Sequence, residues 1–154
     1  MNVRIMPAIM LLAGCAGTYE APTRVAPVVS MNTAAPRAEV IRATKQVLVA
    51  EGYQIAAFDD ASGIISTALR EVRVSPEHAD CGANVGVDNA YLKDSRTRTA
   101  LGIGVVIKEH ALQIRANIDA NYRVGSQMQD MTLICVSRGF LERDLLEKIV
   151  AELH

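Results

Sequence analysis

The chain has 154 residues, of which 50% are apolar and only 4% aromatic, and it contains no tryptophan. This length and composition suit one globular domain with a core of Val, Ile, Leu and Ala side chains. The 16 basic and 17 acidic residues are dispersed and leave a net charge of −1, so composition gives no electrostatic reason to bind nucleic acid.

The first fifteen residues have the layout of a secretion signal. Arg4 precedes an apolar run, Ile5–Leu12, and small residues at Ala13 and Gly14 stand directly before Cys15. A basic start, a short apolar middle and small residues at the cleavage site are typical of such signals. The alternatives are a buried N-terminal helix or a membrane span, but a span takes about 20 apolar residues.

The tetrapeptide Leu12-Ala13-Gly14-Cys15 resembles the lipobox of bacterial lipoproteins. The resemblance implies a signal peptide (1–14) and a lipidated Cys15. From composition and pattern we expect a flexible tether after the cysteine (15–35) and then one domain (36–154). The protein would then bind a membrane through the lipid on Cys15. In this family an aspartate after the cysteine favours the inner membrane. Ala16 therefore points to the outer membrane, with the domain facing the periplasm.

Cleavage at this site would remove Arg4 and no acidic residue, which leaves 15 basic and 17 acidic residues and a net charge of −2. The segment that follows, 16–35, contains Pro22 and Pro27 and shows no sustained hydrophobic period. Extended at about 3.1 Å per residue, it could hold the domain up to about 60 Å from the membrane. The alternative is a first edge strand through Val25, Val28 and Val29.

The first strong element is a helix over about 36–51. Proline is tolerated in the first turn of a helix, and Pro36 starts this one. Apolar residues then recur at helical spacing as far as Leu48, and Gly52 suits a C-terminal cap. A second helix over about 139–153 has leucine or isoleucine at every fourth position from Leu141.

Strands are expected between these helices. The predicted ranges are 53–58 and 64–74 around a turn at 59–63, then 99–108, 111–123 and 131–136. The segment 75–98 is the least regular part, and a short strand near 84–91 is left open.

The strand at 111–123 has the clearest alternation in the chain. Its apolar residues face one way and its polar residues the other, as in an antiparallel sheet that is covered on one side. The polar row consists of Gln113, Arg115, Asn117, Asp119, Asn121 and Arg123. We interpret this row as a possible surface for an envelope protein partner or the cell wall; the alternative is an ordinary solvated face.

The element order predicts an α+β fold. We expect a two-layer sandwich with an antiparallel sheet of about 4–6 strands and both helices, about 36–51 and 139–153, on one face. The order, with Glu51-Gly52-Tyr53-Gln54-Ile55, Phe58-Asp59 and Gly63-Ile64-Ile65, resembles small helix-and-sheet domains of outer-membrane lipoproteins such as lipoprotein C of the barrel assembly machinery. The run from Cys135 to Glu142 resembles the end of small lipoproteins of unknown function. These resemblances imply a fold and no functional residue.

Cys81 and Cys135 remain once Cys15 is assigned to the lipid. An exported chain meets an oxidising compartment, so a disulfide between them is expected. The alternatives are two free thiols, or a metal site that includes His78. The segment lacks paired ligands at zinc spacing, which argues against the metal.

No convergent catalytic set appears in the sequence, so we expect no enzyme, no cofactor and no metal. His110 is placed in a hairpin turn, Asp59 and Asp60 in another, and Met128 and Met131 are read as filling side chains. The sequence favours a non-catalytic interaction or scaffold module of the cell envelope. The alternative is a carrier of a small or lipid-like ligand, in a cavity that the small residues Ala100, Gly102 and Gly104 would leave between sheet and helices.

Overall fold

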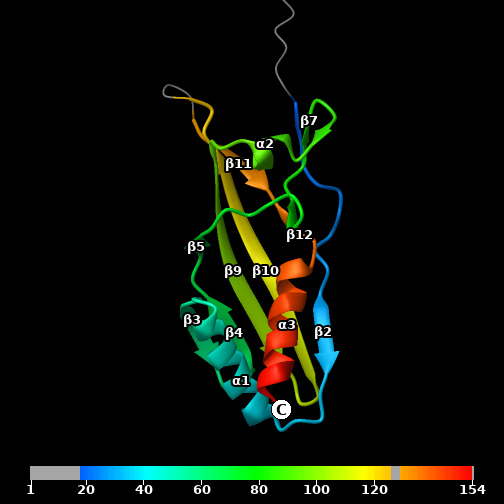
Figure 1. Cartoon of the computed structure of the whole chain (residues 1–154), viewed down its shortest axis with the longest axis vertical. Coiled ribbons are helices and arrows are strands. Elements are labelled where there is room, and N and C mark those ends of the chain that lie inside the picture. The colour runs from blue at the N-terminus through cyan, green and yellow to red at the C-terminus, as the bar shows by residue number, and fades with distance from the viewer. Residues whose placement is uncertain (1–17, 126–128, 154) are drawn as a thin grey trace, which may run out of the picture.

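The structure, a computed structural model, describes residues 18–125 and 129–153. Within them the main sheet has seven antiparallel strands, centred on two long neighbours, β9 and β10 (Figure 1). The strands are β2 (Val29–Asn32), β3 (Ile55–Asp59), β4 (Ile64–Thr67), β5 (Arg70–Glu71), β9 (Thr97–Ile107), β10 (Ala111–Tyr122) and β11 (Met131–Ile134).

Two helices, α1 (Arg37–Ala50) and α3 (Phe140–Glu152), cover one face of this sheet (Figure 1). Alternate residues of β9 and β10 point toward them and are almost completely buried. The core includes Leu101, Ile103, Val105, Ile107, Leu112 and Ile114 from the two strands, and Val40, Leu48, Leu145 and Ile149 from the helices. This arrangement confirms the α+β class and an aliphatic core.

The sheet is larger than the 4–6 strands expected, and smaller sheets accompany it. A three-stranded sheet joins β1 (Tyr19–Glu20), β7 (Ala83–Asn84) and β8 (Val87–Asp88), and a two-stranded one joins β6 (Ala79–Asp80) to β12 (Val136–Ser137). A single-turn helix, α2 (Ala90–Lys93), completes the irregular segment. Strands of two residues are too short to show a period of two, so the sequence pattern did not reveal them.

The segment predicted as a flexible tether is bound to the domain instead. Tyr19 and Glu20 pair with β7, and Val29–Asn32 pairs with β10 in the main sheet. The Tyr19 hydroxyl accepts a hydrogen bond from the backbone N–H of Ile134 at 2.8 Å and donates one to its carbonyl at 3.2 Å. The tether interpretation is wrong from Tyr19 onward, because only short stretches of the segment pair with strands and the stretches between them hide any period.

The long strand expected over 64–74 is interrupted at Ala68 and Leu69. The backbone N–H of Ala68 donates to the carbonyl of Gln54, and the Thr67 hydroxyl accepts from the N–H of Ile103. A Cβ on Gly102 would lie 3.2 Å from Leu69 Cδ2. Leu69 therefore packs on this glycine, and the strand divides into β4 and β5.

One edge of β10 is shared by two short strands with a gap between them. β2 pairs with Ala111–Ile114 and β11 with Asp119–Tyr122. The fully buried Glu142, in the first turn of α3, fills this gap: its Oε1 accepts from the N–H of Ala116 at 3.1 Å. Its Oε2 accepts from the Ser137 hydroxyl at 2.8 Å. This carboxyl group therefore joins the helix to the edge of the sheet.

Candidate docking face

The second face of the main sheet carries no helix in the described part of the chain. Pairing places the polar residues of β10 on it, opposite the small residues of β9: Arg115 faces Gly104, and Asp119 faces Ala100. Of the six predicted residues, five are exposed and Gln113 is half-buried. Arg123 lies just beyond the end of β10. The predicted row therefore exists as one surface, which we call the open face.

Small side chains on β9 leave a depression along the centre of the open face. Ala100 and Gly104 sit on β9 between the larger side chains of β10 and those of β4 and β5. At Gly104 an added Cβ would meet nothing closer than Asn117 Nδ2 at 3.9 Å. At Gly102, Leu69 fills the space. The open face is therefore a shallow trough that Leu69 divides into two hollows.

The hollow beside Gly104, which we call the lower hollow, has a volume of about 160 Å³ and is lined by both apolar and polar groups. Its lining residues come from β4, β9 and β10: Ile64, Ile65, Ser66, Gly104, Val105, Val106, Gln113, Arg115 and Asn117. Ile64 is 47% exposed, a large fraction for an isoleucine. An apolar floor beside an arginine and two amides suits a protein partner better than a small ion.

The hollow beside Ala100, which we call the upper hollow, has a volume of about 190 Å³ and is lined mainly by polar groups. Both acidic and basic groups line it: Glu71, Arg98, Asp119, Arg123 and Asp130, together with Thr99, Ala100 and Asn121. Charges of both signs at close range give directional contacts without a strong net field. The six predicted residues thus divide between the two hollows, three in each.

Sequence reasoning missed the apolar part of this face. Ile64 pairs with Val106, Ile134 pairs with Asp119, and Leu69 lies on Gly102, so all three lie on the open face. Leu69 is 52% and Ile134 58% exposed. The signal was weak, because apolar residues stand next to each other at Ile64-Ile65 and Leu133-Ile134 and so conceal which side chain faces outward.

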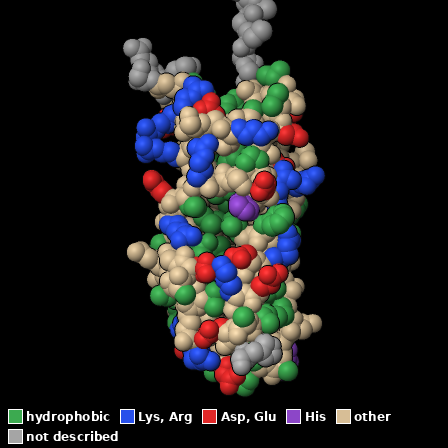
Figure 2. Space-filling model, in the orientation of Figure 1, with side chains coloured by type: hydrophobic (Ala, Val, Ile, Leu, Met, Phe, Trp, Pro, Cys, Tyr) green, Lys and Arg blue, Asp and Glu red, His purple; other side chains and the backbone are tan. Residues whose placement is uncertain are grey.

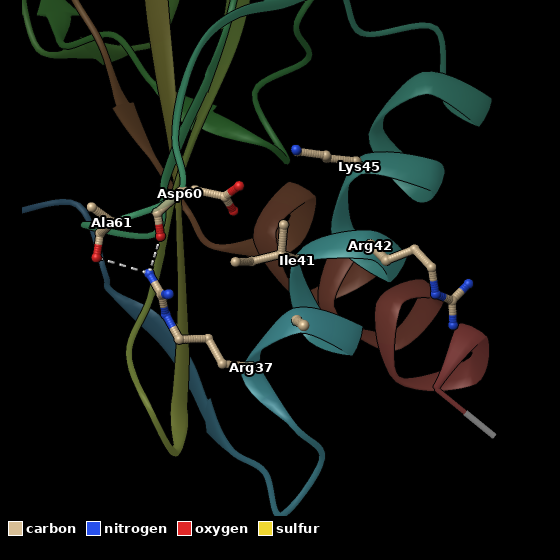
Figure 3. Close-up of a pocket in the computed structure, with 7 residues that line it drawn as sticks. Arg37, Ile41, Arg42, Lys45, Asp60 and Ala61 are labelled. Atoms are coloured by element: carbon tan, nitrogen blue, oxygen red, sulfur yellow. Dashed lines mark hydrogen bonds between the residues drawn. The ribbon is translucent and has the colours of Figure 1, made fainter.

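A hollow of about 680 Å³ lies elsewhere, on the outer flank of α1 beside the turn between β3 and β4 (Figure 3). Its cations are already engaged. Arg37 Nη2 donates to the carbonyls of Asp60 and Ala61 at 2.6 and 3.1 Å, and Arg42 donates to Gln46. Lys45 Nζ lies 3.0 Å from the centre of the Phe58 ring. The contacts of Arg37 and Lys45 fasten α1 to the β3–β4 hairpin, and that of Arg42 lies within the helix, so we assign this hollow a structural role.

The acidic turn at Asp59 is also structural. Its carboxylate accepts from the Ser62 hydroxyl at 2.6 Å and from the N–H of Ala61 at 3.0 Å. The hydrogen bond from Ser62, the largest cause, lowers the pKa of Asp59 below its ordinary value, and the bond from Ala61 adds to this. The Asp59 carboxylate is thus used within its own turn, as the sequence analysis expected.

Cys81 and Cys135 form a disulfide with an S–S distance of 2.05 Å. It joins the segment between β6 and β7 to the residue between β11 and β12, directly beside the β6–β12 pair. His78 lies nearby, where its Nδ1 is 3.1 Å from the Ser75 hydroxyl and its ring packs edge-on against Phe140. The histidine is therefore held in a local turn, and Cys81 is not free to bind a metal beside it.

Other predicted residues are dispersed. His110 is exposed in the turn between β9 and β10, and Met131 packs partly buried against the core. Cys15, Met128 and His154 lie outside the described residues. Across residues 18–125 and 129–153, no group of three His, Cys, Asp or Glu side chains is placed to hold a metal. No helix in the same ranges is long and apolar enough to cross a bilayer.

Comparison with known protein families found no family that matches the chain, and none of the curated proteins matches it.

Proposed function

We propose that this chain is an outer-membrane-anchored periplasmic lipoprotein that acts as a non-catalytic interaction or scaffold module of the cell envelope. The anchor is proposed from the sequence motif at Cys15. The observation that carries the interaction role is the open face, where a trough of small residues on β9 is bordered by polar side chains and by exposed Ile64, Leu69 and Ile134. Exposed apolar groups within a polar row are typical of a docking surface for a protein.

The carrier alternative has less support. Ala100, Gly102 and Gly104 were expected to leave a cavity between sheet and helices, but the register places Gly102 and Gly104 on the opposite face. The helix-facing positions from Leu101 to Ile107 on β9 carry large aliphatic side chains, each with no more than 2% of its surface exposed. A ligand of several hundred cubic ångströms would have to displace this core.

The docking proposal is tested by photocrosslinking in cells. A photoreactive residue at Asn117 should give specific protein adducts, whereas one at the exposed Ala151 on α3 should not. Replacing Arg115 and Arg123 by Glu should reduce the Asn117 adducts, because the cations border both hollows. Exposed substitutions of this kind change stability by less than about 0.5 kcal/mol, which a thermal melt verifies.

Two results would contradict the docking proposal: the same adducts at Asn117 and Ala151, or adducts that the double reversal leaves unchanged. Ile114→Asp serves as a folding control, because this side chain is fully buried and the charge would have no partner there. That variant should unfold and lose all adducts, and it shows what loss of folding looks like in the thermal melt and in the crosslinking assay.

The anchor is tested separately. Cys15→Ser removes the thiol that would accept the lipid, so the variant should remain uncleaved or appear in the soluble fraction. Membrane fractionation and the mass of the N-terminal peptide give the readout. A processed variant that partitions with membranes like the unchanged protein would refute lipidation at Cys15.

A further inference from the structure

The tip of the β7–β8 hairpin is apolar and exposed to solvent. Val85 is 70% and Val87 55% exposed. Val85 has a φ of +50° and Gly86 one of +74°, and nothing lies within 4 Å of an added Cβ on Gly86. A two-residue turn with both residues at positive φ favours Asn-Gly, and a β-branched residue there is strained. The chain thus maintains an exposed valine where a polar residue would fit better, which points to contact with an apolar medium.

The N-terminal chain leaves the domain beside this tip. β1 pairs with β7 with Tyr19 opposite Asn84 and Glu20 opposite Ala83. The antiparallel register therefore brings the next residue toward the N-terminus, Thr18, alongside Val85. Figure 1 shows the chain leaving the molecule at the end that carries β7.

The exit point is firmly held. The ring of Tyr19 packs edge-on against Tyr91 at 5.9 Å, and Tyr91 packs in turn against Tyr122 at 4.7 Å. Burial, the largest cause, raises the pKa of Tyr19, and its hydroxyl is bonded to the backbone of Ile134. A Cβ on Gly82 would lie 2.1 Å from the carbonyl oxygen of Glu20, so β1 lies tightly on the hairpin.

This leaves little chain between the domain and the proposed lipid. Cys15 and Thr18 are three residues apart, so their Cα atoms can be at most about 11 Å apart. The headgroup region of one leaflet is about 5–8 Å thick. A domain attached at Tyr19 therefore reaches the headgroups with its hairpin tip, and no spacer of about 60 Å exists.

We infer that Val85 and Val87 insert into the headgroup region of the bilayer that holds Cys15, so that the domain stands on the membrane on its β7–β8 end. This inference rests on the proposed lipid anchor. The partner that contacts the hairpin tip is therefore a phospholipid surface.

Cations around the same end suit such a surface. Arg73, Lys93, Arg96 and Arg123 are all exposed, and Figure 2 shows Lys and Arg side chains gathered near the end where the N-terminal chain leaves. Lys93 Nζ donates to the carbonyl of Asp88 on β8, and Arg73 Nη2 donates to the carbonyl of Lys93. The carboxylates at this end include Asp94, paired with Arg96, the exposed Glu20 and Asp88, and Asp130, which lines the upper hollow with Arg123. The apolar tip therefore makes the primary contact, and the cations assist with lipid phosphates.

The absence of tryptophan from the chain makes the test direct. Val85→Trp and Val87→Trp each place a single fluorophore on the hairpin, and His110→Trp places one in the exposed turn at the far end of β9 and β10. The full chain, recovered with bacterial membranes, is reconstituted in vesicles that contain anionic phospholipid with bromine on its upper acyl carbons. Val87→Trp keeps the test valid if tryptophan is not tolerated at the strained Val85.

The expected result is at least twofold quenching and blue-shifted emission for the hairpin tryptophans, and none for His110→Trp. Unquenched hairpin fluorescence would overturn the inference. It would also be overturned by a blue shift that depends on protein concentration without vesicles, since that would indicate a second copy of the chain on the tip. The mass of the N-terminal peptide is measured in the same sample, so a missing lipid counts against the anchor and is distinguished from an unquenched tip.

Discussion

Glu142 is the buried polar group on which the contact between α3 and the sheet most depends. Glu142→Ala would leave two buried donors, the N–H of Ala116 and the hydroxyl of Ser137, without their acceptor. An unsatisfied buried donor costs about 1–3 kcal/mol, so the two together should destabilise the domain by about 2–6 kcal/mol. This is a large share of the 5–15 kcal/mol typical of a whole domain.

Urea denaturation of the purified protein measures this loss. Glu142→Gln preserves the volume and can still accept from Ala116 while its amide donates to Ser137, so we expect a loss of about 1 kcal/mol. Glu147→Ala, an exposed position on the same helix, should change stability by less than about 0.5 kcal/mol. A Glu142→Ala variant within about 1 kcal/mol of the unchanged protein would refute the role of this carboxyl group as the partner of the β10 edge.

Two further predictions concern the disulfide and acid stability. Replacing Cys81 and Cys135 by Ser should cost about 2–5 kcal/mol in a urea titration, because the bridge closes a long loop; an unchanged midpoint would contradict this. Hydrogen bonds from Arg96 lower the pKa of Asp94 from 3.8 to about 2. A lowered folded-state pKa contributes stability that is complete above pH 4 and lost as the pH falls toward 2. The unchanged protein should therefore lose more stability than Asp94→Asn between pH 5 and pH 2.5, and equal losses would contradict the assignment.

The long elements were predictable from sequence because their periods persist. The alternation in β10 located the buried and open faces, and the recurrence of leucine and isoleucine located α3. The short pairs β1–β7 and β6–β12 were not predictable, since two residues carry no period and their partners are distant in the chain.

The same limit applies to the candidate site. The polar row was found from one strand, but the trough needs the register between β9, β4 and β10, which places Ile64 beside Gly104 and Arg115. The buried role of Glu142 was also hidden, because an acidic residue in the first turn of a helix is expected to face solvent and favour the helix dipole. Only the gap between β2 and β11 explains why it turns inward.

The attachment of residues 19–32 along the side of the domain has a mechanical consequence. β2 runs away from the end at which the chain leaves the molecule, so a pull on the N-terminus acts along the strand (Figure 1). The hydrogen bonds between Val29–Asn32 and Ala111–Ile114 then carry the load together, as in a joint under shear, and do not open one after another. A pull on the N-terminal side is therefore borne first by the β1–β7 pairing and then by the pairing of β2 with β10, before it can reach α1.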